Sequence, residues 1–212
     1  MNTNITPNLQ QAVAEFRLPR YREIPYVGLY LEQTAKYINM HLSTLGYPEL
    51  TTSMIGNYVK QKIISGPYKK QYGAEHIACL MVLVIMKSVL TIEDARLILD
   101  EKRNQYTVEE GYNIICDIFE AQLKETFQDP SAAKAATVRK KESASPSDGI
   151  VHSVIRAAVN KIHLDMRIDA LRQSALLRHE DAKQKEKEEK KSQKSAKEGE
   201  LHETVDDESA NN

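Results

Sequence analysis

The stretch TTSMIGNYVKQKIISGPYKKQYGAEHIACLMVLVIMKSVL, residues 51–90, decides the fold of this chain. Three hydroxyl side chains at its start can cap a short helix over about 54–62. The apolar residues that share one face of this helix are Ile55, Val59 and Ile63. Gly and Pro then end the helix, and an aromatic and basic connector over 68–72 leads into a third helix over about 74–89. The apolar run of this third helix predicts a position in the core.

Helical periodicity continues on both sides of this stretch. Apolar residues recur at three- and four-residue spacing over about 29–42, before Gly46 and Pro48. Hydroxyl residues followed three positions later by an acid predict helix starts at Thr91 and Thr107. A further amphipathic helix is expected over about 150–177, whereas alternating strand patterns are hard to find. The sequence therefore predicts an all-α fold.

Composition shifts divide the chain into five segments. The predicted order is a flexible N-terminus (1–17), a helical domain (18–127), a linker rich in Ala, Ser and Lys (128–148), an amphipathic helix (149–178) and a charged, disordered tail (179–212). In the tail, alternating Lys and Glu provide no residues from which a core could form.

Several classes of protein are disfavoured by the composition. With 212 residues and 41% hydrophobic residues, the chain can bury one sizeable core. The longest apolar run, 77–86, is too short for a membrane span, and the polar N-terminus does not resemble a secretory signal. We therefore expect a soluble, cytoplasmic protein without a membrane partner. Cys79 and Cys116 both lie in apolar helical runs, where core packing is the expected role.

Catalytic motifs are missing from the sequence. There is no Gly-rich phosphate loop, no Gly-x-Ser-x-Gly elbow and no His-Glu-x-x-His metal pair. His76 lies three residues from Cys79, but one such pair is too few ligands for a metal site. We expect a protein that is not an enzyme and needs no cofactor or metal.

Charge is unevenly distributed although the formal net charge is only −1. Residues 51–90 carry five lysines against a single glutamate, whereas residues 91–127 carry nine acids against four bases. The simplest interpretation of the lysines is an ordinary solvated helix face. Their coincidence with a helix-turn-helix pattern instead favours DNA as the partner.

A helix-turn-helix inserts its second helix into the major groove, so that helix needs one apolar and one polar side. The predicted recognition helix, about 53–62, satisfies this requirement, and the connector forms a short wing over about 66–72. Asn and Gln can pair with adenine edges, and Lys can contact phosphates. The candidate DNA-binding residues are Ser53, Asn57, Tyr58, Lys60, Gln61, Lys62, Lys69, Lys70 and Tyr72. Packing of the wing is the alternative role for Tyr58 and Tyr72.

Residues 52–99 resemble the DNA-binding head of MerR-type regulators. The positions that carry this resemblance are Tyr58, Ile63-Ile64, Pro67, Tyr72, Glu75, Ile77 and the run Leu90-Thr91-Ile92-Glu93-Asp94. The longer stretch 18–99 resembles an uncharacterised domain-of-unknown-function family of Gram-positive bacteria that is described as MerR-like. The chain departs from the regulator pattern in three ways: Gly56 replaces an arginine, the wing is shorter, and the turn over 43–51 is longer.

Two functions are compatible with these features. The resemblance and the local charge imply a DNA-binding transcriptional regulator, expected to act as a homodimer because one short helix contacts few base pairs. The apolar stripes of the last two helices, which need a surface to cover them, also suggest dimerisation. The alternative is a non-enzymatic protein-interaction adaptor that kept the fold, for which Gly56 and the charged tail are the motivation. No segment after Phe127 resembles a known sensor module, so the sequence names no effector.

Overall fold

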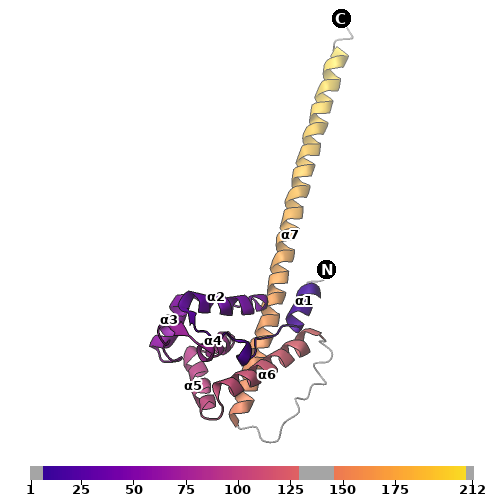
Figure 1. Cartoon of the computed structure of the whole chain (residues 1–212). Coiled ribbons are helices and arrows are strands. Elements are labelled where there is room, and N and C mark those ends of the chain that lie inside the picture. Colours follow the sequence, from indigo (N-terminus) through magenta and orange to yellow (C-terminus); the bar gives the residue numbers. More distant parts are fainter. Residues whose placement is uncertain (1–6, 129–145, 209–212) are drawn as a thin grey trace. The chain divides into compact units, whose positions relative to one another are not determined.

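The computed structural model describes residues 7–128 and 146–208 (Figure 1). Its helices are α1 (Pro7–Ala14), α2 (Leu31–Leu42), α3 (Thr52–Lys60), α4 (Ala74–Lys87), α5 (Ile92–Arg103), α6 (Val108–Gln128) and α7 (Pro146–Glu208). The strands β1 (Leu29–Tyr30) and β2 (Gln71–Tyr72) pair antiparallel, and short 3-10 turns cover Tyr21–Glu23 and Ser43–Leu45. The prediction of an all-α fold is confirmed, with one small sheet added to it.

Helix α4 forms the centre of the core. Its buried residues are Ile77, Ala78, Leu80, Met81, Val82, Leu83, Ile85 and Met86. A helix that is apolar almost all round must be covered on several sides. Here α2, α5 and α6 all contact it. The long apolar run that is too short for a membrane span is therefore the core helix, as the sequence predicts.

Capping residues set the starts of α5 and α6. Thr91 Oγ1 accepts a hydrogen bond from Asp94 N at 3.2 Å, and Thr107 Oγ1 accepts one from Glu110 N at 3.3 Å. The carboxylate of Glu110 also accepts from Thr107 N at 3.0 Å, which completes a reciprocal capping box. Both predicted starts are confirmed. Helix α5 extends to Arg103, beyond its expected end near Leu99.

The N-terminal segment corrects one prediction. The expectation of a flexible segment over 1–17 is wrong for Pro7–Ala14, which form α1. Val13 and Ala14 are buried, and α1 packs against α6, where Gln10 Nε2 donates a hydrogen bond to the carbonyl of Phe127 at 2.8 Å. The few apolar residues here give too weak a periodic pattern for α1 to be predicted without its partner helix.

The first part of α7 packs within the same compact unit, residues 5–166, as the helices before it. Its buried residues are Val151, Val154, Ile155, Ala158, Val159 and Ile162. The ring of His163 meets that of Phe127 edge-on, with 5.2 Å between centroids. The stripe of α6 is buried in the same unit through Tyr112, Cys116, Phe119, Leu123 and Phe127. These two stripes are covered within one chain, so they no longer argue for a dimer.

From Arg167 onward the chain forms a second unit. This unit contains the rest of α7, with Leu171, Leu176 and Leu177 exposed. The segment after Arg178, where the sequence predicts a charged tail, is helical as far as Glu208. Lys, Glu and Ala are all strong helix formers, which favours this conformation. The predicted linker, 128–148, lies almost entirely outside the described residues, as does the end of the tail.

Candidate nucleic-acid interface

The short helix α3 presents one polar face to solvent. It begins at a capped end, where Thr51 Oγ1 accepts a hydrogen bond from Met54 N at 3.2 Å. Side chains spaced three or four residues apart lie on one side of a helix. The exposed residues with this spacing, together with their neighbours, are Ser53, Gly56, Asn57, Lys60 and Gln61. The structure therefore brings the candidate groove-reading residues of the helix together on one accessible face.

The buried side of α3 differs in one position from the prediction. Ile55 and Tyr58 are the buried residues of the helix, whereas Val59 is only half-buried. Tyr58 is 7% exposed, and burial raises the pKa of its phenol, which therefore stays neutral. As a candidate contact residue Tyr58 is corrected: it anchors the helix from beneath and does not line its surface. Packing, the alternative role, is the one observed.

The turn that leads into α3 is clamped by a single side chain. Asn39, on α2, donates from Nδ2 to the carbonyl of Leu50 at 3.1 Å and accepts from Leu50 N at 2.8 Å. Leu50 itself is buried. This double hydrogen bond fixes the longer turn over 43–51 relative to α2, and so sets where α3 begins.

Helix α3 ends in a Schellman motif with a lysine at the left-handed position. Ile63 N donates to the carbonyl of Tyr58 at 2.9 Å, and Lys62 N donates to that of Val59 at 3.0 Å. Lys62 has φ 58°, in the region where glycine is the usual residue. Its side chain is exposed beside Lys60 and Gln61.

The wing contains a tight turn with two more lysines in the left-handed region. Gln71 N donates to the carbonyl of Tyr68 at 2.8 Å, which closes the turn around Lys69 (φ 47°) and Lys70 (φ 67°). Two consecutive positive φ values are those of a type I′ turn, for which Asn-Gly is the preferred pair. Both lysines are exposed, and Lys69 Nζ lies 5.3 Å from the centre of the Tyr68 ring. Within the described residues, every non-glycine residue with positive φ is one of these three lysines.

The base of the wing is held by a strand whose residues were predicted to belong to the helix over about 29–42. Leu29 pairs with Tyr72, and Tyr30 with Gln71, so α2 begins only at Leu31. The pairing requires Gly28, because a Cβ there would lie 2.7 Å from Gln71 Cβ. Tyr72 is 5% exposed, so its proposed DNA contact is also corrected: its ring supports the wing from within.

His76 fastens the wing at both ends. Gly73 N donates to His76 Nδ1 at 3.1 Å, so Nε2 carries the ring proton. Nε2 lies 3.2 Å from both Ser65 Oγ and the carbonyl of Gly66, where the wing begins. The imidazole also meets the ring of Tyr72 edge-on. This role of His76 was not predicted, because the sequence pointed only to its nearness to Cys79.

Two arginines of the otherwise acidic segment reach the end of α3. Arg96 Nη1 lies 3.3 Å from the carbonyl of Gln61, and Arg103 Nη2 donates to that of Ile63 at 3.0 Å. Both guanidinium groups also pair with Asp100. These residues were not predicted, because a net count over 91–127 hides single bases that the fold brings to the end of a neighbouring helix.

Exposed aromatic residues lie on the wing and in the segment before α2. Tyr68 is 74% exposed, and Tyr26 and Tyr30 also face solvent before α2. A shallow cleft between the start of α2 and the wing is lined by Tyr30, Leu31, Glu32, Gln33, Pro67, Lys70 and Tyr72. The surface of the wing is therefore both basic and aromatic, with one carboxylate at its edge.

Two further kinds of site were looked for in the described residues, a metal centre and a membrane span. Among the residues whose side chains the structure describes, no group of three or more His, Cys, Asp or Glu could hold a metal ion. None of the helices over residues 7–128 and 146–208 is long and apolar enough to cross a bilayer. Cys116 is buried, and burial raises the pKa of its thiol to about 11.

The described residues before α7 thus form a helical domain in which a short exposed helix is followed by a lysine-bearing turn. Residues 19–121 match the model of a family described as a domain of unknown function, DUF1836. The match confirms the expectation of an uncharacterised domain family. It contains α2 to α5 and all of the interface residues, whereas α1 and α7 lie outside it. Searches of the curated proteins and of the solved structures give no match.

Proposed function

We propose that this chain is a DNA-binding transcriptional regulator that places α3 in the major groove and its lysine-bearing turn on the adjacent phosphates. The proposal names Ser53, Asn57, Lys60 and Gln61 as the groove face. Lys62, Lys69 and Lys70 are the phosphate-binding residues. All of these side chains are exposed in the free chain.

The observation that carries the proposal is the backbone conformation of the three lysines. A side chain at positive φ is destabilising, and glycine or asparagine would fit each position better. Lysine nevertheless occupies the left-handed position at the end of α3 and both central positions of the turn. Backbone strain of this kind is concentrated at functional sites. A requirement for positive charge at these places explains why the less stable residue is present.

DNA phosphates are the partner that fits such a requirement. Phosphate contacts position a protein on the duplex, and helices with exposed amide side chains read base edges in the major groove. Asn57 and Gln61 supply amides on the exposed face of α3. Gly56, next to Asn57, has open space in front of it, since nothing lies within 4 Å of an added Cβ, and its missing side chain lets a duplex approach the backbone closely. The arginine of the regulator pattern that Gly56 replaces has possible substitutes in Lys60 and Lys62.

We further propose that the regulator acts as a homodimer. One short helix spans few base pairs, and two-fold pairing doubles the recognised site. The size of the recognised site is the only support for this dimer, since the stripes of α6 and α7 are covered within the chain. Light scattering of the purified protein gives the oligomeric state directly, and a monomer at micromolar concentration would remove this part of the proposal.

The function is tested by selecting duplexes from a random-sequence library and measuring affinity across salt. We expect saturable binding that weakens as salt rises, with a slope of about 0.9 per phosphate contact. Changing Lys60, Lys69 and Lys70 to Glu should abolish it, whereas Lys124→Glu on α6, also exposed, should leave it unchanged. No binding at low salt, or equal binding by both variants, would refute the proposal.

A protein-interaction adaptor is the second candidate, and the exposed residues before α2 favour it. Tyr26 is 93% exposed and Val27 58%, next to the exposed Tyr30. Neighbouring exposed apolar side chains are typical of protein contacts. Co-purification from the source organism decides between the two. A stoichiometric protein partner that protects 26–30 and 54–72 from hydrogen exchange would favour the adaptor.

A further inference from the structure

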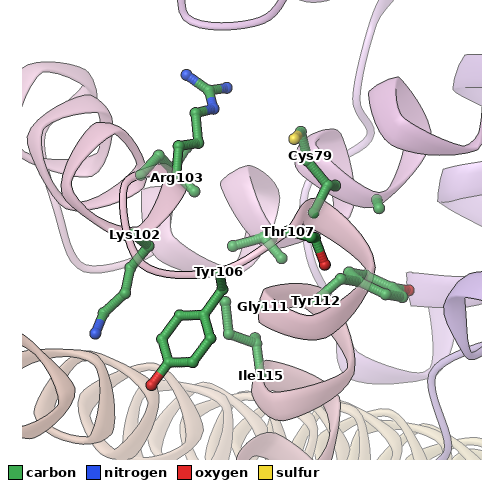
Figure 2. A pocket seen from close by; sticks show the side chains of 12 residues that line it. Cys79, Lys102, Arg103, Tyr106, Thr107, Gly111, Tyr112 and Ile115 are labelled. Atoms are coloured by element: carbon green, nitrogen blue, oxygen red, sulfur yellow. The ribbon is translucent and has the colours of Figure 1, made fainter.

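The cleft between the start of α2 and the wing is large enough to hold a small molecule. Its volume is about 610 Å³. Sites for small molecules typically measure about 300–1,000 Å³. Figure 2 shows another hollow, between α4, α5 and α6, whose volume is only about 50 Å³. The cleft beside the wing is therefore the better candidate for a ligand site.

The pairing of β1 with β2 brings two kinds of side chain together in this cleft. Tyr30 pairs with Gln71, which follows Lys70 in the turn of the wing. The start of α2, with Glu32 and Gln33, directly follows Tyr30. An aromatic ring, a lysine, a carboxylate and an amide thus line one cleft, although they come from segments about forty residues apart in the sequence.

The aromatic part of the lining favours a ligand with a flat ring. Tyr30 is 55% exposed and lines the cleft together with Leu31 and Pro67. Nucleobases stack on exposed tyrosine rings, and apolar neighbours keep water away from the stacked ring.

The wing gives this cleft a positive edge. Lys70 lines the cleft, and Lys69 precedes it in the same left-handed turn. Both lysines are exposed, and Lys70 forms no ion pair with another described residue. With two lysines near a single glutamate, the cleft favours an anionic ligand, and lysine binds phosphate as a point charge.

Glu32 and Gln33 favour one base among those that could stack on Tyr30. Gln33 Oε1 accepts a hydrogen bond from Tyr30 N at 3.0 Å, which leaves its side-chain NH₂ as a donor for a ligand. Glu32 is exposed and forms no ion pair with another described residue. A carboxylate can accept two parallel N–H bonds. Guanine offers N1–H and N2–H₂ side by side with the O6 acceptor next to them, whereas adenine would place its N1 lone pair against the carboxylate.

We propose that this cleft binds a free guanine nucleotide, with the base stacked on Tyr30, its N–H groups on Glu32 and its phosphate on Lys70. The binding itself is independent of DNA. Its consequence for regulation rests on the proposed function: Lys70 is also assigned to a DNA phosphate, so the nucleotide and the duplex compete for the wing.

Calorimetric titration of the full chain with GMP, IMP and AMP tests the site. We expect saturable binding of GMP that is about tenfold or more tighter than that of AMP, because hydrogen bonds to a charged group are lost with adenine. IMP, which keeps N1–H and O6 but lacks the N2 amine, should bind with intermediate affinity. No saturable binding of GMP, or equal affinities for GMP and AMP, would overturn the proposal.

Variants assign the two ends of the ligand. Glu32→Gln should reduce the preference for GMP over AMP about tenfold. Lys70→Gln should weaken the binding of GMP but not that of guanosine, which has no phosphate, and Lys124→Gln on α6 is the control that should change neither. An unchanged preference in Glu32→Gln, or equal losses for GMP and guanosine in Lys70→Gln, would contradict the assigned contacts. If a variant does not fold, amide NMR shifts of Gln33 and Gln71 in the unchanged chain on titration with GMP locate the site, and shifts confined to other residues would overturn it.

Competition is measured last, with a selected duplex in the presence and absence of saturating GMP. Duplex affinity should fall with GMP and stay unchanged with AMP at the same concentration. An undiminished duplex affinity would overturn the competition. Binding of a guanine-containing single strand without binding of GMP would mean that the cleft takes a base of the nucleic acid, which would overturn the free nucleotide. The titrations with mononucleotides need no duplex, so a failed DNA-binding test leaves them interpretable.

Discussion

Asn39 and Leu50 are joined by two hydrogen bonds, of 3.1 Å from the amide nitrogen of Asn39 and 2.8 Å to its amide oxygen. A single side chain on α2 thereby satisfies both backbone groups of a buried residue in the turn before α3. Because unpaired backbone groups are costly to bury, this pair fixes the path of the chain between the two helices.

Asn39→Ala should lower the free energy of unfolding by about 1–3 kcal/mol, because it leaves the N–H and carbonyl of Leu50 without their partner. Urea denaturation measures this change. Met40→Ala, an exposed neighbour on α2, is the control and should have an effect near zero. Equal effects of the two substitutions would mean that the double hydrogen bond does not hold the turn.

His76→Phe should loosen the wing while keeping an aromatic ring against Tyr72. The substitution removes the acceptor for Gly73 N and the contacts to Ser65 and Gly66, so we expect a stability loss of about 1 kcal/mol. Hydrogen exchange at Gly73 and Gln71 should become faster, whereas exchange in α6 should stay unchanged. Unaltered hydrogen exchange at Gly73 would mean that His76 does not hold the wing in place.

The contacts of the segment after α1 with Glu120 on α6 give a third prediction. Arg20 Nη2 lies 2.8 Å from Glu120 on α6, whose other oxygen accepts from Leu18 N at 2.9 Å. Glu120→Gln removes the charge from these partly buried hydrogen bonds and should destabilise the chain by about 1–3 kcal/mol. Arg22→Ala, which removes a highly exposed ion pair, should change stability far less. A reversed order of the two effects in thermal unfolding would refute this account.

The capping box of α6 predicts a dependence of stability on pH. Hydrogen bonds from the Thr107 side chain and backbone hold the pKa of Glu110 below its ordinary value. A carboxyl whose pKa is depressed on folding stabilises the fold above its unfolded pKa, about 4.3, and loses this contribution as pH falls through the folded value. The urea concentration at the unfolding midpoint should therefore decrease when the pH is lowered below about 4.5. Glu110→Gln should lower the urea midpoint at pH 7 and make its decrease at acidic pH smaller. If the midpoint of this variant depended on pH as in the unchanged chain, Glu110 would not be the source of the pH dependence.

Much of the fold could be predicted from local sequence signals. The core position of α4 follows from its apolar run, and the starts of α5 and α6 follow from Thr91 and Thr107, because these signals act within a few residues. Helix α1 and strand β1 could not be predicted in this way. Each is formed by contacts with a distant segment, α6 in one case and the wing in the other.

Part of the candidate site could also be predicted from local sequence signals. The outward positions of Asn57 and Lys60 follow from helical spacing, and both are exposed. The burial of Tyr58 and Tyr72 depends on tertiary packing. The contacts of Arg96 and Arg103 depend on where the fold places α5 relative to the carbonyls of Gln61 and Ile63. Paired glycines or asparagines are the usual sequence signal of a left-handed turn, so the turn at Lys69 and Lys70 could not be read from its residues.

The central claim is that Lys62, Lys69 and Lys70, whose backbone lies in the left-handed region, lower the stability of the fold but bind DNA phosphates. Substituting these three lysines tests the claim most directly. Lys62→Gly, Lys69→Asn and Lys70→Gly each fit their backbone positions better than lysine does, and each should raise the free energy of unfolding by about 0.5–1 kcal/mol. The triple variant should be more stable than the unchanged chain, yet bind duplex DNA more weakly, with a shallower dependence of affinity on salt. A variant that is more stable and binds DNA with undiminished affinity and salt dependence would contradict the account.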